Sequence, residues 1–99
     1  MYFITCMEQC KTYLGFFYGG DTRCIGYYDD LSVAIKALNE NSCDLHETCY
    51  WYAVIEEIGQ GIYPSNKGEW WFKYDKDKEG FFAIEKPKEA EFVCNHALG

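Results

Sequence analysis

Only two of the 99 residues are proline, and no apolar run approaches the roughly 18 residues that a membrane-spanning helix needs. The first ten residues also lack the basic start and small-residue cleavage site of a secretory signal. The lack of a membrane-spanning run and of a secretory signal predicts a cytosolic protein with no membrane partner. With 48% hydrophobic and 25% charged residues, the composition is typical of a globular chain rather than a disordered one. A chain of this length supports one hydrophobic core, so we expect a single domain over residues 1–99.

Basic residues are scarce as well, and the formal net charge is -7. A protein this acidic lacks the positive surface on which sequence-independent DNA or RNA binding depends, which argues against a direct nucleic-acid partner. Seven of the acids fall within residues 29–57, where Lys36 is the one basic residue. This segment predicts either an ordinary solvated face or an acidic surface that imitates a nucleic acid and covers a basic protein surface.

The six cysteines would make three disulfides in a secreted chain, but without an export signal we expect reduced thiols that fill the core. Cys43, His46 and Cys49 recur at every third position, and Cys94 with His96 forms a second group. Structural zinc sites usually combine two tight ligand pairs, which this run does not provide. Because these pairs are missing, a small zinc-binding domain is an alternative and not the preferred prediction. The preferred interpretation makes these cysteines core residues and His46 a hydrogen-bonded residue at the core boundary, with no cofactor.

Motifs for catalysis are also missing. The adjacent residues His46 and Glu47 would point to opposite faces of a strand, so they do not form an acid and base pair. No cysteine stands in a recognisable protease motif. Residues 75–80 imitate the first half of a calcium loop, but position twelve is Lys86 rather than glutamate, which favours a polar hairpin turn. We therefore predict a protein without enzymatic activity.

Apolar periodicity predicts an α+β fold. The expected strands cover residues 2–7, 22–28, 49–58, 69–74 and 81–86, with 91–96 as a further edge strand, 8–21 as a loop or loose hairpin, and 64–68 as a turn. The expected architecture is a mostly antiparallel sheet of about five to six strands with one helix packed across a face, in the order β-β-α-β-β-β.

The helix is expected over residues 31–39, with Asp29 or Asp30 as the N-cap. Its apolar stripe consists of Leu31, Ala34, Ile35 and Leu38. One further helical turn is expected over 42–48. The spacing of the stripe predicts that the helix lies across the sheet.

Residues 49–58 form the longest strand candidate and are apolar on both faces, which predicts a central strand covered on both sides. Alternation places Tyr50 and Tyr52 on one face and Trp51 and Ala53 on the other.

Aromatic residues make up 19% of the chain, more than a small core needs. Alternation directs Trp71 away from the face that Trp70, Phe72 and Tyr74 share, so we expect Trp71 to expose its ring to a partner or a planar ligand. Aromatic faces stack nucleobases, and Arg23, the single arginine, is the natural bidentate partner of a phosphate. The candidate ligand-binding residues are Arg23, Tyr28, His46, Trp51, Trp70, Trp71 and Tyr74. In the other interpretation the rings fill a thin core or the seam of a homodimer.

Six segments carry a resemblance over most of the chain. They are residues 25–41, 44–47, 52–58, 61–64, 71–75 and 80–87. Together they resemble a family of small uncharacterised proteins from gut bacteria, their phages and mobile elements. The resemblance carries no catalytic motif, but it implies a setting in which small phage proteins often inhibit host defence.

From this setting and the aromatic residues we expect a non-enzymatic phage or mobile-element binding protein that inhibits host defence by sequestering a nucleotide-derived immune signal. One alternative is an acidic protein–protein inhibitor of a host defence protein, of the nucleic-acid-mimic or anti-CRISPR type. The small zinc-binding domain is the other alternative.

Overall fold

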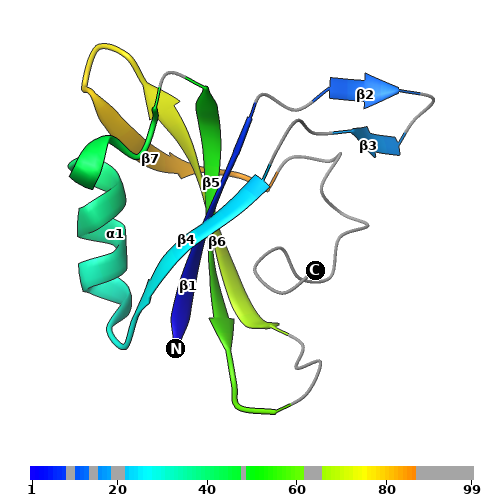
Figure 1. Ribbon diagram of the computed structural model, residues 1–99, viewed down its shortest axis with the longest axis vertical. Helices are drawn as coiled ribbons and strands as arrows, with labels where there is room; N and C mark the ends of the chain where they lie inside the picture. The colour runs from blue at the N-terminus through cyan, green and yellow to red at the C-terminus, as the bar shows by residue number, and fades with distance from the viewer. Residues whose placement is uncertain (9–10, 14–15, 19–21, 48, 62–65, 87–99) are drawn as a thin grey trace.

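Five antiparallel strands form one open sheet in the computed structural model, and one helix lies across one of its faces (Figure 1). The structure is described for residues 1–8, 11–13, 16–18, 22–47, 49–61 and 66–86. The strand order is β4-β1-β5-β6-β7. The strands of this sheet are β1 (Tyr2–Glu8), β4 (Thr22–Tyr28), β5 (Tyr50–Ile58), β6 (Asn66–Asp75) and β7 (Gly80–Ile84). The predicted α+β class and the order β-β-α-β-β-β within the sheet are confirmed.

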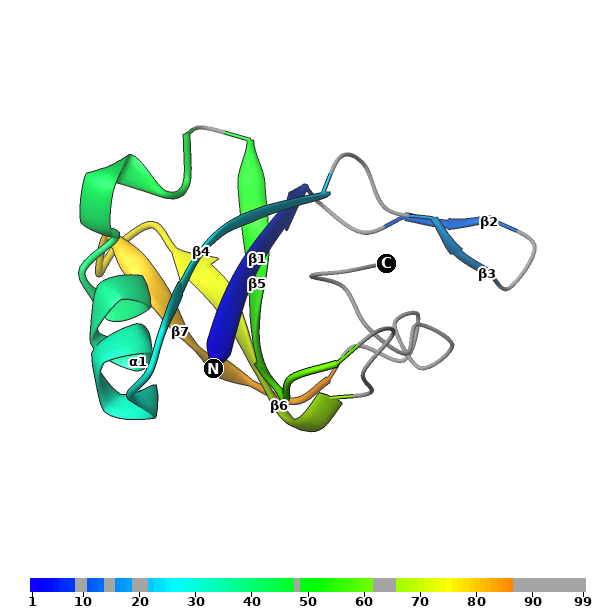
Figure 2. The same cartoon turned by 60° about the horizontal axis from the view of Figure 1, so that its bottom comes forward.

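A short two-stranded sheet lies between β1 and β4 in the chain. Its strands β2 (Lys11–Tyr13) and β3 (Phe16–Tyr18) pair antiparallel, within the region predicted as a loop or loose hairpin. Figure 2 shows this pair projecting away from α1. The predicted edge strand over 91–96 lies outside the described residues.

The helix α1 (Leu31–Asn39) has the predicted bounds. Asp30 is the N-cap, and its Oδ1 accepts hydrogen bonds from the backbone N–H groups of Ser32, at 2.8 Å, and Val33, at 3.4 Å. Hydrogen bonds from Ser32, first from its hydroxyl and then from its backbone, lower the pKa of Asp30. Leu38 is fully buried, which stabilises the packing of α1 by about 2 kcal/mol. In the described ranges, no helix is long and apolar enough to cross a membrane.

Both faces of the sheet are buried at its centre, as predicted for the strand over 49–58. The helix face, which α1 covers, buries Ile4, Cys6, Tyr50, Ala53, Ile55, Phe72 and Phe81. The opposite face buries Met7, Val54 and Trp71, with Tyr52 packed beside them. Because β5 is also paired on both of its edges, it is the central strand of the fold.

A β-bulge interrupts β5 at Trp51. Met7 of β1 pairs with Tyr52, whereas the next residue of β1, Glu8, pairs with Tyr50, so Trp51 is the extra residue in the ladder. An extra residue resets the alternation of side chains, which turns Tyr50 onto the helix face. Tyr50 is buried in the helix-face cluster, so its predicted grouping with Tyr52 is wrong.

Strands β6 and β7 form the predicted hairpin with different ends. β6 begins at Asn66, because Gly68 still pairs with Glu57 and the ladder continues beyond it through a second irregularity. The predicted turn over 64–68 is therefore wrong for its last three residues. β7 ends at Ile84, two residues earlier than expected.

The connection between β6 and β7 is a polar turn. Oδ1 of Asp75 accepts hydrogen bonds from the backbone N–H groups of Asp77, at 2.9 Å, and Lys78, at 3.2 Å. These two bonds form an Asx turn, which is typical of a polar turn between strands. The prediction of a polar hairpin turn over 75–80 is confirmed.

Gly80, the first residue of β7, packs against the last turn of α1. It is buried, and a Cβ at this position would overlap the backbone carbonyl of Asn39. Because a backbone carbonyl cannot yield unless α1 moves, we expect Gly80→Ala to lower the free energy of unfolding by about 3 kcal/mol. The control is Gly26→Ala, where a Cβ would meet nothing within 4 Å, and there we expect a change below about 1 kcal/mol. Urea denaturation measures both values, and equal destabilisation of the two variants would contradict this contact.

Candidate functional site

Three aromatic rings meet on the helix face, and we call them the aromatic cluster: His46, Trp51 and Tyr74. The rings of His46 and Tyr74 are stacked with parallel planes and centroids 3.8 Å apart. Trp51 stands edge-on to both, with centroids 4.8 Å from His46 and 6.0 Å from Tyr74. Phe81 borders the cluster, 5.3 Å from Tyr74. All three members of the cluster were predicted from the sequence as candidate site residues, and the fold brings them into contact.

Sheet register explains how two of these rings meet. Tyr52 of β5 pairs with Lys73 of β6, so the preceding residue Trp51 and the following residue Tyr74 lie side by side on the same face. Trp51 shares the helix face with Ala53 by ordinary alternation, and the bulge places Tyr50 on that face beside it.

The third ring comes from the segment that joins the 3-10 helix η1 (Ser42–Asp44) to β5. Asn41, at the N-cap of η1, has a left-handed backbone with φ 50°, and its Oδ1 accepts a hydrogen bond of 2.9 Å from the backbone N–H of His46. The carbonyl of His46 in turn accepts from the N–H groups of Cys49 and Tyr50. These hydrogen bonds fix the backbone conformation at His46 independently of the contacts that its ring makes.

The His46 ring has one defined tautomer. Its Nδ1 is within hydrogen-bond distance of the Tyr50 carbonyl, which can only accept, so Nδ1 carries the proton. Nε2 of the neutral ring is then a hydrogen-bond acceptor. His46 is half-buried, as predicted for a hydrogen-bonded residue at the core boundary.

Two cations border the aromatic residues. The Lys76 ammonium lies 5.0 Å from the centre of the Trp51 ring, and Lys76 is exposed. On the other side, Arg23 is exposed and its guanidinium donates a hydrogen bond to the Tyr50 hydroxyl. Burial raises the pKa of Tyr50, and the positive charge of Arg23, together with its hydrogen bond, offsets part of that rise. Arg23 therefore reaches the same region of the helix face as the aromatic cluster.

The other three candidate residues lie elsewhere. Tyr28 is at the far end of β4, where it lines a groove of about 270 Å³ together with Ile25 and Leu45. Trp70 is on the helix face, and its ring centroid is 6.0 Å from that of Tyr2. Arg23, His46, Trp51 and Tyr74 thus form one region, and Tyr28, Trp70 and Trp71 do not belong to it.

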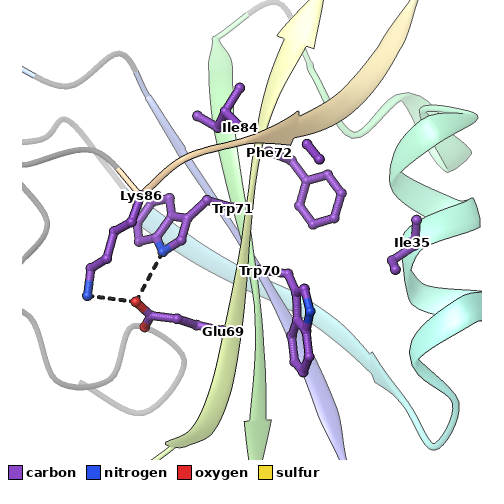
Figure 3. Close-up of a pocket in the computed structure, with 8 residues that line it drawn as sticks. Ile35, Glu69, Trp70, Trp71, Phe72, Ile84 and Lys86 are labelled. Atoms are coloured by element: carbon purple, nitrogen blue, oxygen red, sulfur yellow. Dashed lines mark hydrogen bonds and ion pairs between the residues drawn. The ribbon is translucent and has the colours of Figure 1, made fainter.

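Trp71 contradicts its prediction of an exposed ring. Alternation placed it correctly on the face opposite α1, but it is only 3% exposed and packs with Met7 and Val54. Its indole N–H donates a hydrogen bond of 3.3 Å to Glu69, whose carboxylate also forms a 2.6 Å ion pair with Lys86 (Figure 3). The predicted exposure of Trp71 is wrong because the face opposite α1 is also buried at the centre of the sheet.

A cavity of about 350 Å³ lies beside these residues, near the end of β7 (Figure 3). Trp70, Phe72 and Ile35 line it on the helix side, and Ile84 lines it on the other. Most of this lining is apolar. Lys86 is already paired with Glu69, so the cavity suits an apolar side chain better than a phosphate.

The cysteines separate into different environments. The four described cysteines are free thiols: Cys6 is buried and Cys49 half-buried, whereas Cys24 and Cys43 are exposed. The prediction of core cysteines is wrong for Cys24, which is exposed on the outer strand β4, and for Cys43, which lies in η1 with a φ of 55° and is exposed to solvent. Burial raises the pKa of the Cys6 thiol to about 12, so this thiol stays protonated at neutral pH.

Metal ligands do not converge in the part of the chain that the structure describes, where no three His, Cys, Asp or Glu side chains could hold an ion together. Cys94 and His96, the second predicted ligand group, lie outside the described residues. The zinc alternative therefore receives no support from the residues around His46.

Lys76 and Asn41 belong to the region but were not among the candidate site residues. Lys76 sits in an alternating run of lysine and acid that is typical of a solvated turn, and its contact with Trp51 depends on the β6–β7 hairpin. Asn41 follows the predicted helix end, which is a position that favours a left-handed backbone. That preference was the one local signal that could have identified it.

The stack of His46 on Tyr74 should be measurable as a coupling. We expect the variants His46→Leu and Tyr74→Leu to show a coupling free energy of about 1 kcal/mol in a double-mutant cycle of unfolding. The control pairs His46→Leu with Tyr27→Leu, because Tyr27 is exposed and contacts Phe3 instead, and these effects should add. A coupling near zero for His46 and Tyr74 would show that the stack does not contribute.

Comparison with known proteins gives this chain no relative. No protein-family model matches it, and no curated protein and no solved structure shows significant similarity to it. Its function is therefore inferred from the geometry of its own residues.

Proposed function

We propose that this chain is a non-enzymatic binding protein that sequesters a nucleotide-derived signal at the aromatic cluster. The observation that carries the proposal is the mutual contact of His46, Trp51 and Tyr74, with Lys76 over the Trp51 ring and Arg23 bonded to the neighbouring Tyr50. Ring faces beside cations match the two halves of a nucleotide, since a base stacks and a phosphate needs positive charge. The setting in a phage or mobile element, as an inhibitor of host defence, rests on the sequence resemblance.

The base would take the face of Trp51 that Lys76 now covers. A cation–π contact at an exposed site contributes about 0.5–1 kcal/mol, whereas a stacked base contributes roughly 1–3 kcal/mol. A base therefore displaces the Lys76 ammonium with a net gain. The long side chain of Lys76 then carries its charge to the phosphate instead.

Polar groups at the cluster would orient the ligand. Nε2 of His46 is an acceptor that suits an exocyclic amino group of a base. Arg23 offers a planar set of donors to a phosphate, in addition to its bond to Tyr50.

The net charge of -7 opposes any anion, so stacking and direct contact with the two cations must supply the affinity. At physiological ionic strength, acids more than about 8 Å from the phosphate are largely screened. Repulsion is therefore limited to nearby acids such as Glu47 and Asp75.

Isothermal titration against a panel of AMP, ATP, NAD and cyclic dinucleotides tests the proposal. We expect at least one member to bind, and we expect Trp51→Leu to weaken that binding about tenfold, because stacking on the indole is lost. The matched control is Tyr27→Leu, which removes an exposed ring on the opposite face and should leave the affinity unchanged. If no member of the panel releases heat with the unmodified protein, the sequestration proposal fails.

A second candidate function is the acidic inhibitor of a host defence protein. Five of the seven acids in residues 29–57 have exposed side chains: Asp29, Asp30, Glu40, Asp44 and Glu47. Lys36, the one basic residue of this segment, lies 3.9 Å from the Glu40 carboxylate. The surface around α1 and η1 therefore offers uncompensated negative charge to a basic partner.

For this second candidate, affinity capture from a host lysate at low salt should return a basic, nucleic-acid-binding protein. The combined variant Glu40→Gln, Asp44→Asn and Glu47→Gln should lose most of the capture, because long-range attraction falls with the exposed charge. Glu57→Gln is the control, since Glu57 is half-buried in β5. Capture of no basic partner, or equal loss with the control, would count against the acidic inhibitor.

A further inference from the structure

The two outer strands of the described sheet, β4 and β7, differ in how they are protected against pairing. β4 is irregular, because Gly26 pairs with Ile4 and Cys24 with Thr5, which leaves Ile25 as an extra residue. It also carries the charged Arg23. Bulges and charges are the usual means by which proteins prevent an edge strand from pairing with another chain.

β7 has neither protection. Its ladder with β6 is regular from Gly80 to Ile84, and none of its five residues is charged. Ala83 is exposed, and Ile84 is 37% exposed. A regular, uncharged and apolar edge strand with exposed side chains is the feature that natural sheets avoid unless the strand is paired.

The cavity of about 350 Å³ adjoins the same strand, since Ala83 and Ile84 line it together with Trp70 and Phe72. Strand addition to a sheet edge uses main-chain hydrogen bonds for affinity and pockets for side chains of the added strand. The edge of β7 and this cavity provide both.

We propose that a second copy of this chain pairs antiparallel with β7, which joins the two sheets into one continuous sheet about a two-fold axis. Each copy brings the same uncharged edge, so the surface is complementary to itself, as a two-fold interface requires. Paired residues must point to the same face of the joined sheet. The two-fold axis therefore passes through a residue of β7 and not between two residues.

The charges that flank β7 and the turn that precedes it select that residue. With the axis at Phe82, Glu79, which directly precedes β7, would come next to Glu85 of the partner subunit. Like charges directly opposite each other destabilise a sheet. An axis at Phe81 pairs only Gly80, Phe81 and Phe82, because Ala83 and Ile84 would then face the β6–β7 turn of the partner subunit, where no strand continues.

An axis at Ala83 avoids both the pair of glutamates and the turn. It places Phe82 opposite Ile84 of the partner subunit twice, once on each side of the axis. Lys86 of the partner subunit then lies opposite Gly80, next to Glu79 of the first copy. This register brings no like charges together over residues 79–86, keeps Phe82, Ala83 and Ile84 paired with strand residues of the partner subunit, and buries the exposed part of Ile84.

The molar mass in solution tests the interface. By light scattering behind a size-exclusion column at about 100 µM, we expect the unmodified protein to have twice the 11.6 kDa mass of one chain. Ile84→Lys should reduce the mass to that of one chain, because a charge is placed on the seam. Thr22→Lys, on the outer strand β4, is the matched control and should leave the dimer intact. A single-chain mass for the unmodified protein, or loss of the dimer in the control but not in Ile84→Lys, would overturn the proposal.

Crosslinking tests the register without disturbing the fold. Under mild oxidation, Ala83→Cys should gain a disulfide between the two copies of position 83, located by peptide mass mapping and absent from the unmodified protein. Ile84→Cys faces the partner subunit's Phe82 and should gain no disulfide between the two copies of position 84. A dimer in which only Ile84→Cys crosslinks would overturn the register at Ala83.

Discussion

Strand β5 is hydrogen-bonded to β1 on one side and to β6 on the other, and the remaining elements take their places through these two ladders. Its residues Ala53, Val54 and Ile55 are fully buried, so the strand is removed from water on both faces. Removal of apolar surface from water is the main driving force of such a fold. β1 holds β4 in place and β6 holds β7. Both Arg23 and Lys76 therefore depend on the position of β5.

Local sequence patterns predicted the elements but not their local irregularities. The bounds of α1 were predictable because an N-cap aspartate and an apolar stripe are encoded within a dozen neighbouring residues. The bulge at Trp51 depends on the register between β1 and β5, which no local pattern contains. Alternation gave the correct face for Trp71, but whether that face is covered depends on the whole fold. The contact of His46 with Tyr74 joins segments that are far apart in the sequence. Local patterns could not predict it either.

The aromatic cluster is already packed before any ligand arrives. The stack of His46 on Tyr74 and the backbone bonds around Asn41 restrict these side chains to one arrangement. Binding to a preformed arrangement loses less conformational entropy than binding to a mobile one. The same packing occupies one face of the Tyr74 ring, so the proposed ligand has room only at Trp51, beside the exposed Lys76 side chain.

The position of β1 between β4 and β5 has a consequence for the maturation of the chain. Tyr2 pairs with Tyr28 on one side and with Glu57 on the other. During synthesis at roughly 5–20 residues per second, β1 can pair with β4 soon after both leave the ribosome, but its second edge waits for β5. For those seconds an apolar strand is open to neighbouring nascent chains. The strand order of the sheet thus sets an interval during synthesis in which a chaperone can bind the unpaired edge of β1.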